Sequence, residues 1–212
     1  MKKVFFGGSF DPPHYGHLGV AKAAIASGRC SEVVWFPAAS PPHKLHASRA
    51  SFGDRFNMVK LLISGEADMS VSDFESRIDF YPSYTIDVLD KLQIETGEKF
   101  GLLIGADSLI SLHTWYRAKE LVKKVEIITY PRINSPVSLD KLKEFWEPDT
   151  AEKLYQSVIP GTFFEISSTE VKNSMEKNDF RHHIIKDAVL PAPIANYIRE
   201  HGLYQTGDIR KG

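Results

Sequence analysis

The sequence contains a single cysteine, Cys30, among its 212 residues. A disulfide bond within the chain is therefore impossible, which is typical of proteins from a reducing compartment. Hydrophobic runs long enough to cross a bilayer are also missing, and the polar turn at 7–15 interrupts the first apolar run too early for a secretory signal. We therefore expect a cytoplasmic protein without a membrane segment.

An excess of charge of either sign is missing as well. The 26 lysines and arginines and the 27 aspartates and glutamates leave a formal net charge of −1. Proteins that bind nucleic acid usually carry a strong basic field, so we expect no nucleic-acid partner. No internal repeat stands out either. The length fits one domain, which we place at 1–204, followed by a disordered tail at 205–212.

The most informative stretch runs from Lys3 to Leu18, KVFFGGSFDPPHYGHL. Its first apolar residues predict a buried strand, Gly7 and Gly8 end that strand, and Asp-Pro-Pro is typical of a turn. From Tyr15 onwards, apolar residues recur at helical spacing until Gly28. A strand, a glycine turn and a helix start offer free backbone N–H groups and the positive end of a helix to an anion.

His14 and His17 lie three positions apart at this helix start, a spacing that places both imidazoles on one helix face. A metal-binding pair or a solvated surface pair are alternatives, although a metal site would need more ligands than nearby Asp11 supplies. As a whole, GGSFDPPHYGHL resembles the GGxFDPxHxGH signature of the HxGH nucleotidyltransferase superfamily. Its members join a nucleoside monophosphate to an acceptor that bears a phosphate.

The rest of the chain alternates between strand and helix patterns. We expect further strands over 32–36, 69–74, 100–104, 125–130 and 163–166. We expect helices over 51–63, 84–92, 168–177 and 194–201, a short one closed by 121–122, and one or two polar helices within 134–160. This alternation favours an α/β fold, a Rossmann-like doubly wound parallel sheet in a single domain with a small C-terminal helical part. The resemblance implies the strand order 3-2-1-4-5.

A proline-rich loop that contains Lys44 follows the second predicted strand. Most lysines are solvated surface residues, and Lys44 alone would be read in that way. Pro41 and Pro42, however, stiffen this loop above the predicted phosphate site. The run PPHK is similar to the superfamily run whose lysine acts on the triphosphate.

Two further runs, SYT at 83–85 and GADSL at 105–109, precede a tryptophan at 115. Asp107 could cap a helix and Trp115 could fill a core. Together these runs resemble the nicotinate-mononucleotide adenylyltransferase branch of the superfamily, in which they line the acceptor pocket. We expect a ring stacked on an aromatic side chain, a carboxylate held by neutral donors, and no acidic side chain beside it. The resemblance implies these acceptor-binding residues: Tyr84, Thr85, Gly105, Asp107, Trp115, Tyr116 and Arg132.

The run FFEISSTEVKNSM contains Ser167, Ser168 and Thr169 before a predicted helix. Alone, such residues are most simply a helix N-cap. The run also resembles the ISSTxIR motif that holds ATP phosphates, with Lys172 in place of the usual arginine and therefore without its bidentate fork. The ATP-binding residues implied by the resemblance are Gly7, Gly8, Ser9, Phe10, His14, His17, Lys44, Ser167, Ser168, Thr169 and Lys172, and the catalytic ones are His14, His17 and Lys44.

The resemblance implies transfer of AMP from ATP to nicotinate mononucleotide, which gives deamido-NAD and pyrophosphate in NAD biosynthesis. Mg²⁺ would bridge phosphate oxygens and keep several waters, so we expect no dedicated protein cage for the metal. The expected partners are these two small molecules, and a homo-oligomer is compatible with the sequence. A pantetheine-phosphate adenylyltransferase, whose similar run has threonine where this chain has His14, is one alternative. A sensor that holds ATP without turnover is another.

Overall fold

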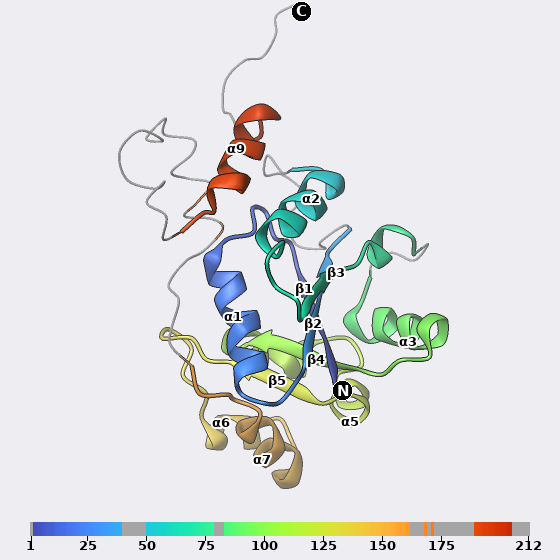
Figure 1. The fold of residues 1–212 in the computed structure, drawn as a ribbon. Helices are drawn as coiled ribbons and strands as arrows, with labels where there is room; N and C mark the ends of the chain where they lie inside the picture. Colours follow the sequence, from blue (N-terminus) through green and yellow to red (C-terminus); the bar gives the residue numbers. More distant parts are fainter. Residues whose placement is uncertain are drawn as a thin grey trace, which may run out of the picture.

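The computed structural model describes residues 2–39, 50–78, 83–161, 168, 171 and 189–204, and its centre is a five-stranded parallel sheet (Figure 1). The strands are β1 (Lys3–Gly8), β2 (Glu32–Pro37), β3 (Met69–Val71), β4 (Phe100–Gly105) and β5 (Ile127–Tyr130). Their order is β3-β2-β1-β4-β5, so the predicted Rossmann-like α/β fold is confirmed. The sixth strand expected over 163–166 lies outside the described residues.

Two layers of helices cover the sheet (Figure 1). One core packs beneath α1 (Tyr15–Ala26), α2 (Phe52–Leu62) and α9 (Ala192–Glu200). The other packs beneath α3 (Thr85–Thr96), α4 (Ala106–Ser111), α5 (Ala118–Lys124), α6 (Leu139–Lys143) and α7 (Pro148–Gln156), with the short 3₁₀ helices η1 (Phe74–Ser76) and η2 (Leu112–Thr114). Val4 and Phe6 of β1 join the first core, whereas Phe5 joins the second. Because both faces of the sheet are covered, the central strands are apolar over most of their length.

Several element boundaries differ from the predicted ones. Gly7 and Gly8 do not stop β1 ahead of them but are its last two residues, since they continue its parallel pairing with Phe36 and Pro37 of β2. The third strand ends at Val71, and Phe74 lies in η1 instead. β3 lies at the edge of the sheet and pairs with β2 alone. It therefore extends only as far as β2 offers hydrogen-bonding partners.

The buried face of α2 also differs from the prediction. Helical spacing with Val59 and Leu62 predicts that Phe52 and Phe56 point inward, but they are half-buried and stack on one another with ring centroids 6.1 Å apart. Arg55 and Met58 are buried instead. The segment 134–160 forms two short helices, as predicted, and Thr129 at the end of the sheet forms a parallel bridge with Val158. Within the described ranges, no helix has the length and apolar character needed to cross a membrane.

Candidate active site

The carboxyl ends of the parallel strands bring the predicted motifs to one edge of the sheet. The Ala38 N–H, just after β2, donates to the Gly8 carbonyl at the end of β1 at 2.9 Å. β4 leads directly into α4 at Gly105, and Arg132 follows the end of β5. In open parallel sheets, ligands bind at this edge, near the reversal of strand order. Here the order reverses at β1, between β2 and β4.

Phe10 fixes the turn that follows β1. Its backbone lies in the left-handed region, with φ +47°, which is strained for a bulky side chain. Its ring is 2% exposed and contacts Trp35 and His17, with centroids 5.0 and 5.2 Å away. A Cβ on residue 8 would come within 2.9 Å of this buried ring, which favours glycine at that position. The Phe10 side chain therefore anchors the turn to the core. Its part in ATP binding stays a prediction.

His14 and His17 lie together at the start of α1, with ring centroids 3.8 Å apart. His14 is the N-cap residue and is 3% exposed. Its backbone N–H donates to Nδ1 of His17 at 3.3 Å. A backbone N–H can only donate, so Nδ1 carries no proton and a neutral His17 ring holds its proton on Nε2. The helix start thus orients His17 with Nε2–H as its donating position.

His17 is held in this neutral form. Burial, the neighbouring His14 and the positive charge of Arg132 hold the pKa of His17 well below its usual value of 6.5. Ionisation costs most where a ring is desolvated beside other positive groups. His17 therefore acts as a neutral hydrogen-bond donor near pH 7. As the pH falls below 6.5, the unfolded chain gains a proton at this residue before the folded one does, so its contribution to stability is lost in acid.

Asp11 joins the same turn to two distant parts of the chain. Its buried carboxylate accepts from the Tyr204 hydroxyl at 2.6 Å and from the Ala50 N–H at 3.2 Å. The Ser168 hydroxyl donates to the carbonyl of Pro12, the next residue, at 3.1 Å. The predicted SST run therefore meets the DPPH turn through Ser168. The turn itself meets the C-terminal segment through the bond from Tyr204 to Asp11.

Arg55 of α2 joins three segments at this edge through backbone carbonyls. Its guanidinium is 1% exposed and donates to Ser9 at 2.8 Å, to Ala38 at 2.7 Å and to Ala50 at 3.3 Å. Charged hydrogen bonds to buried carbonyls are stronger than neutral ones and leave few alternatives for the backbone. Arg55 therefore fixes the ends of β1 and β2 relative to one another.

We expect Arg55→Met to lower the free energy of unfolding by about 3–5 kcal/mol, because three buried carbonyls lose a charged donor. Denaturant unfolding monitored by circular dichroism measures this loss. Arg199→Met is the matched control, because Arg199 is exposed on α9 and bonds only to Asn196 among the contacts described. It should change the free energy by less than about 0.5 kcal/mol. An Arg55 variant as stable as this control would contradict the prediction.

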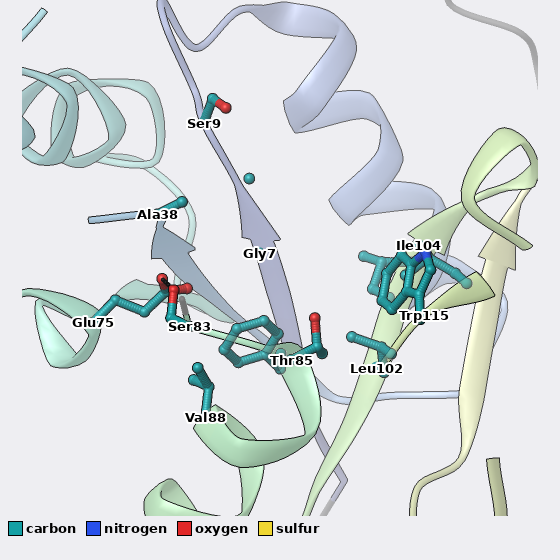
Figure 2. Close-up of a pocket in the computed structure, with 13 residues that line it drawn as sticks. Gly7, Ser9, Ala38, Glu75, Ser83, Thr85, Val88, Leu102, Ile104 and Trp115 are labelled. Carbon is teal, nitrogen blue, oxygen red and sulfur yellow. Dashed lines mark hydrogen bonds between the residues drawn. The ribbon is translucent and has the colours of Figure 1, made fainter. Parts of the chain in front are cut away.

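A cavity of about 240 Å³ opens beside Gly7 and Gly8, between β1 and the start of α3. Figure 2 shows Thr85 between Trp115 on one side and Glu75 with Ser83 on the other. Of the predicted acceptor-binding residues, Thr85 and Trp115 line this cavity. A planar ring can therefore lie against Trp115 within reach of the Thr85 hydroxyl and of the glycine backbone.

Glu75 overturns the expectation that the cavity holds no acidic side chain. Its carboxylate lines the cavity, is 7% exposed, and accepts from the Ser83 hydroxyl at 3.5 Å and from the Ala39 N–H. Burial raises the pKa of Glu75 to about 7, although both hydrogen bonds and the charge of Arg55 oppose the shift. Desolvation outweighs these contacts, and the carboxyl group titrates near neutral pH.

Four of the other five predicted acceptor-binding residues form two pairs and, like Gly105, do not line this cavity. Tyr84 and Tyr116, neighbours of Thr85 and Trp115, stack with ring centroids 4.3 Å apart. Arg132 forms an ion pair with Asp107, with Nε and Oδ1 2.9 Å apart. A Cβ on Gly105 would come within 3 Å of both side chains of this pair, which would have to shift to accept it. The ion pair therefore joins the start of α4, after β4, to the segment that follows β5, and the cavity lies between β1 and α3.

Four predicted ATP-binding residues, Lys44, Ser167, Thr169 and Lys172, lie outside the described residues, as does the tail at 205–212. Three buried polar residues of the site were missed from the sequence: Arg55, Glu75 and Tyr204. A signal for Arg55 was present, since it falls on the same helix face as Val59 and Leu62, where an arginine needs buried partners. Glu75 and Tyr204 carry no comparable local signal.

Comparison with known proteins adds three findings. Residues 5–174 match the cytidylyltransferase-like family. A probable nicotinate-nucleotide adenylyltransferase of Gloeobacter violaceus is 38% identical over 202 residues, which cover 94% of each chain, and one of Desulfotalea psychrophila is 34% identical over 219 residues, covering 96% of this chain and all of the relative. Nicotinic acid mononucleotide adenylyltransferase of Plasmodium falciparum, solved with NaAD, superposes with a TM-score of 0.74 at 22% identity over 96% of this chain and 98% of that chain.

Proposed function

Because this chain belongs to the cytidylyltransferase-like family of nucleotidyltransferases, we propose that it transfers AMP from ATP to nicotinate mononucleotide. The products are nicotinate adenine dinucleotide and pyrophosphate. The relatives named above carry this activity in their names and cover nearly the whole chain. The observation that carries the proposal is the cavity lined by Trp115 and Thr85, which adjoins the glycine backbone at the end of β1.

The reaction needs positioning and charge stabilisation rather than a protein nucleophile. An oxygen of the acceptor phosphate attacks the α-phosphorus of ATP, and the bond from that phosphorus to the bridging oxygen breaks with its electron pair leaving on pyrophosphate. In this proposal the Gly7 and Gly8 backbone and Ser9 approach the phosphates. His17 donates from Nε2–H to the charge that develops in the transition state.

The remaining phosphate ligands are proposed from the sequence. His14 lies beside His17 at the same helix start and completes the pair. Ser168 is bonded to the DPPH turn, which supports a place for the SST run at the phosphates. The ammonium groups of Lys44 and Lys172 would neutralise the negative charge of the phosphates as point charges.

A divalent cation fits this site as a component of the nucleotide substrate. Among the residues that the structure describes, no three His, Cys, Asp or Glu side chains cluster at metal-ligand distance. Mg²⁺ commonly binds through substrate phosphates and water with few protein ligands. We propose that it enters with ATP and neutralises phosphate charge, while the chain itself holds the phosphates through glycine backbone and His17.

Pyrophosphate release from ATP, measured with a panel of mononucleotide acceptors, tests this function directly. Nicotinate mononucleotide should support release, and phosphopantetheine should not. An ATP-binding sensor would bind ATP and release no pyrophosphate with any acceptor. Turnover with phosphopantetheine alone would instead favour the sister adenylyltransferase.

We expect Trp115→Ala to raise the KM for the mononucleotide acceptor about tenfold and to leave the KM for ATP nearly unchanged, because stacking on an aromatic ring contributes about 1.5 kcal/mol beyond its buried area. Steady-state kinetics with each substrate varied in turn measures both constants. Tyr155→Ala, on the exposed face of α7, is the control and should alter neither. Equal increases in both KM values would contradict the prediction and would indicate that the substitution disturbs the whole ligand-binding edge of the sheet.

A further inference from the structure

Glu75 stands in the acceptor cavity without a role in the transfer reaction. It reaches the cavity from η1, which follows the edge strand β3, while Thr85 and Trp115 reach it from α3 and from the end of η2. In Figure 2 its carboxylate points toward Ser83 on the side of the cavity opposite Trp115. An acidic group is an unexpected neighbour for an acceptor that carries both a carboxylate and a phosphate.

The charged groups around Glu75 do not cancel its charge. Among the described residues, the facing cation is Arg55 of α2, whose three nitrogens already bond to backbone carbonyls. On its own segment, Asp73 and Arg77 pair with one another at the surface, and from α3 Asp87 pairs with Arg117. The direct partners of the carboxylate are the Ser83 hydroxyl and the Ala39 N–H, which are neutral. The charge on Glu75 therefore depends mainly on its burial.

We propose that Glu75 determines acceptor specificity through its protonation state: the neutral carboxyl group admits an acceptor with a ring carboxylate, and the ionised carboxylate disfavours it. An acceptor with a neutral ring amide is affected far less. This inference rests on the proposed function and names a residue that sets its substrate class. Glu75 acts by charge on the bound ring and takes no part in bond making.

The size of the cavity sets the strength of the effect. A volume of about 240 Å³ corresponds to a sphere roughly 8 Å across, and we take about this distance for the separation between a ring carboxylate and Glu75. Two like charges at that distance, with an effective dielectric constant of about 20, repel strongly enough to weaken binding about tenfold or more. Because the pKa of Glu75 is about 7, the change falls between pH 6 and pH 8.5.

The test compares kcat/KM for nicotinate mononucleotide and nicotinamide mononucleotide at pH 6.0 and pH 8.5. The preference of the wild-type enzyme for nicotinate should fall about tenfold over this range, whereas Glu75→Gln should show no such fall. Both acceptors carry the same phosphate, so its own titration near pH 6 cancels in the ratio. Glu144→Gln is the matched control: Glu144 is exposed at the end of α6, does not line the cavity, and should behave as wild type.

A binding measurement provides an independent readout on the unmodified enzyme. Calorimetry at pH 7.5, in two buffers of different ionisation enthalpy, should detect more proton uptake for nicotinate mononucleotide than for nicotinamide mononucleotide. Equal uptake, or a pH-independent preference, would overturn the inference while leaving the proposed function intact. A fall in preference that persists in Glu75→Gln would also overturn it. Failure of both mononucleotides to support pyrophosphate release would overturn the proposed function and this inference together.

Discussion

Replacing His17 with alanine is expected to lower kcat by about 10²–10³-fold while the fold survives. The loss follows from geometry: the His14 N–H occupies Nδ1, so the proton of the neutral ring sits on Nε2 and can be donated to a phosphate oxygen. Removal of one such donor from a transition state typically costs this much. Single-turnover measurement of pyrophosphate release isolates the chemical step from product release.

The position of the donated proton allows a sharper comparison. His17→Gln can place a side-chain amide N–H near the position of Nε2, so it should recover part of the activity that His17→Ala loses. His113→Ala is the control, since His113 stacks on Phe145 away from this edge, with centroids 3.7 Å apart, and should keep full activity. A His17→Ala enzyme with near-normal turnover would remove His17 from the mechanism.

Nicotinate mononucleotide is expected to exceed nicotinamide mononucleotide by roughly a hundredfold in kcat/KM below pH 7. The Thr85 hydroxyl and the free N–H groups at the start of α3 can donate to both oxygens of a carboxylate. A ring amide presents its own N–H₂ group to those donors, which leaves polar groups unpaired on both sides. Each buried unpaired group costs about 1–3 kcal/mol, and two give this ratio.

Glu75 limits the conditions under which that preference is measured. Below its pKa of about 7 the carboxyl group is neutral and adds a further donor to the cavity. Initial rates for both acceptors at pH 6.0–6.5, with ATP saturating, therefore give the comparison its clearest form. Equal values, or a preference for the amide, would contradict the arrangement of donors proposed here, even if adenylyl transfer itself were observed.

The strand pattern and the position of the site could be predicted because each depends on local sequence. Short apolar runs such as EVVWF are typical of buried strands. The carboxyl ends of parallel strands meet at one edge of the sheet, where ligands bind. The DPPH turn and the two histidines follow from the residues of a single stretch. The boundaries at β1 and β3 were less accurate because they depend on how far a neighbouring strand extends.

The buried polar residues could not be predicted because their partners are distant in the sequence. Arg55, rather than Phe52 or Phe56, lies at the buried face of α2, because backbone carbonyls of three other segments converge there. Glu75 enters the acceptor cavity because η1 follows the edge strand, although its sequence neighbours are those of an ordinary surface loop. Local periodicity reports which face of a helix is buried, but it does not identify which polar group that face must satisfy.

The hydrogen bond from Tyr204 to Asp11 spans 193 positions and joins the C-terminal segment to the turn that carries the two histidines. During synthesis, the first strand and its turn leave the ribosome well before Tyr204, which is added 193 positions after Asp11. The buried carboxylate of the turn can therefore accept this hydrogen bond only after the chain has been extended to Tyr204. A chain truncated before Tyr204 would retain every predicted catalytic residue and still lack this contact. Stalled or shortened products should consequently bind nucleotide poorly before they show any loss of the central sheet.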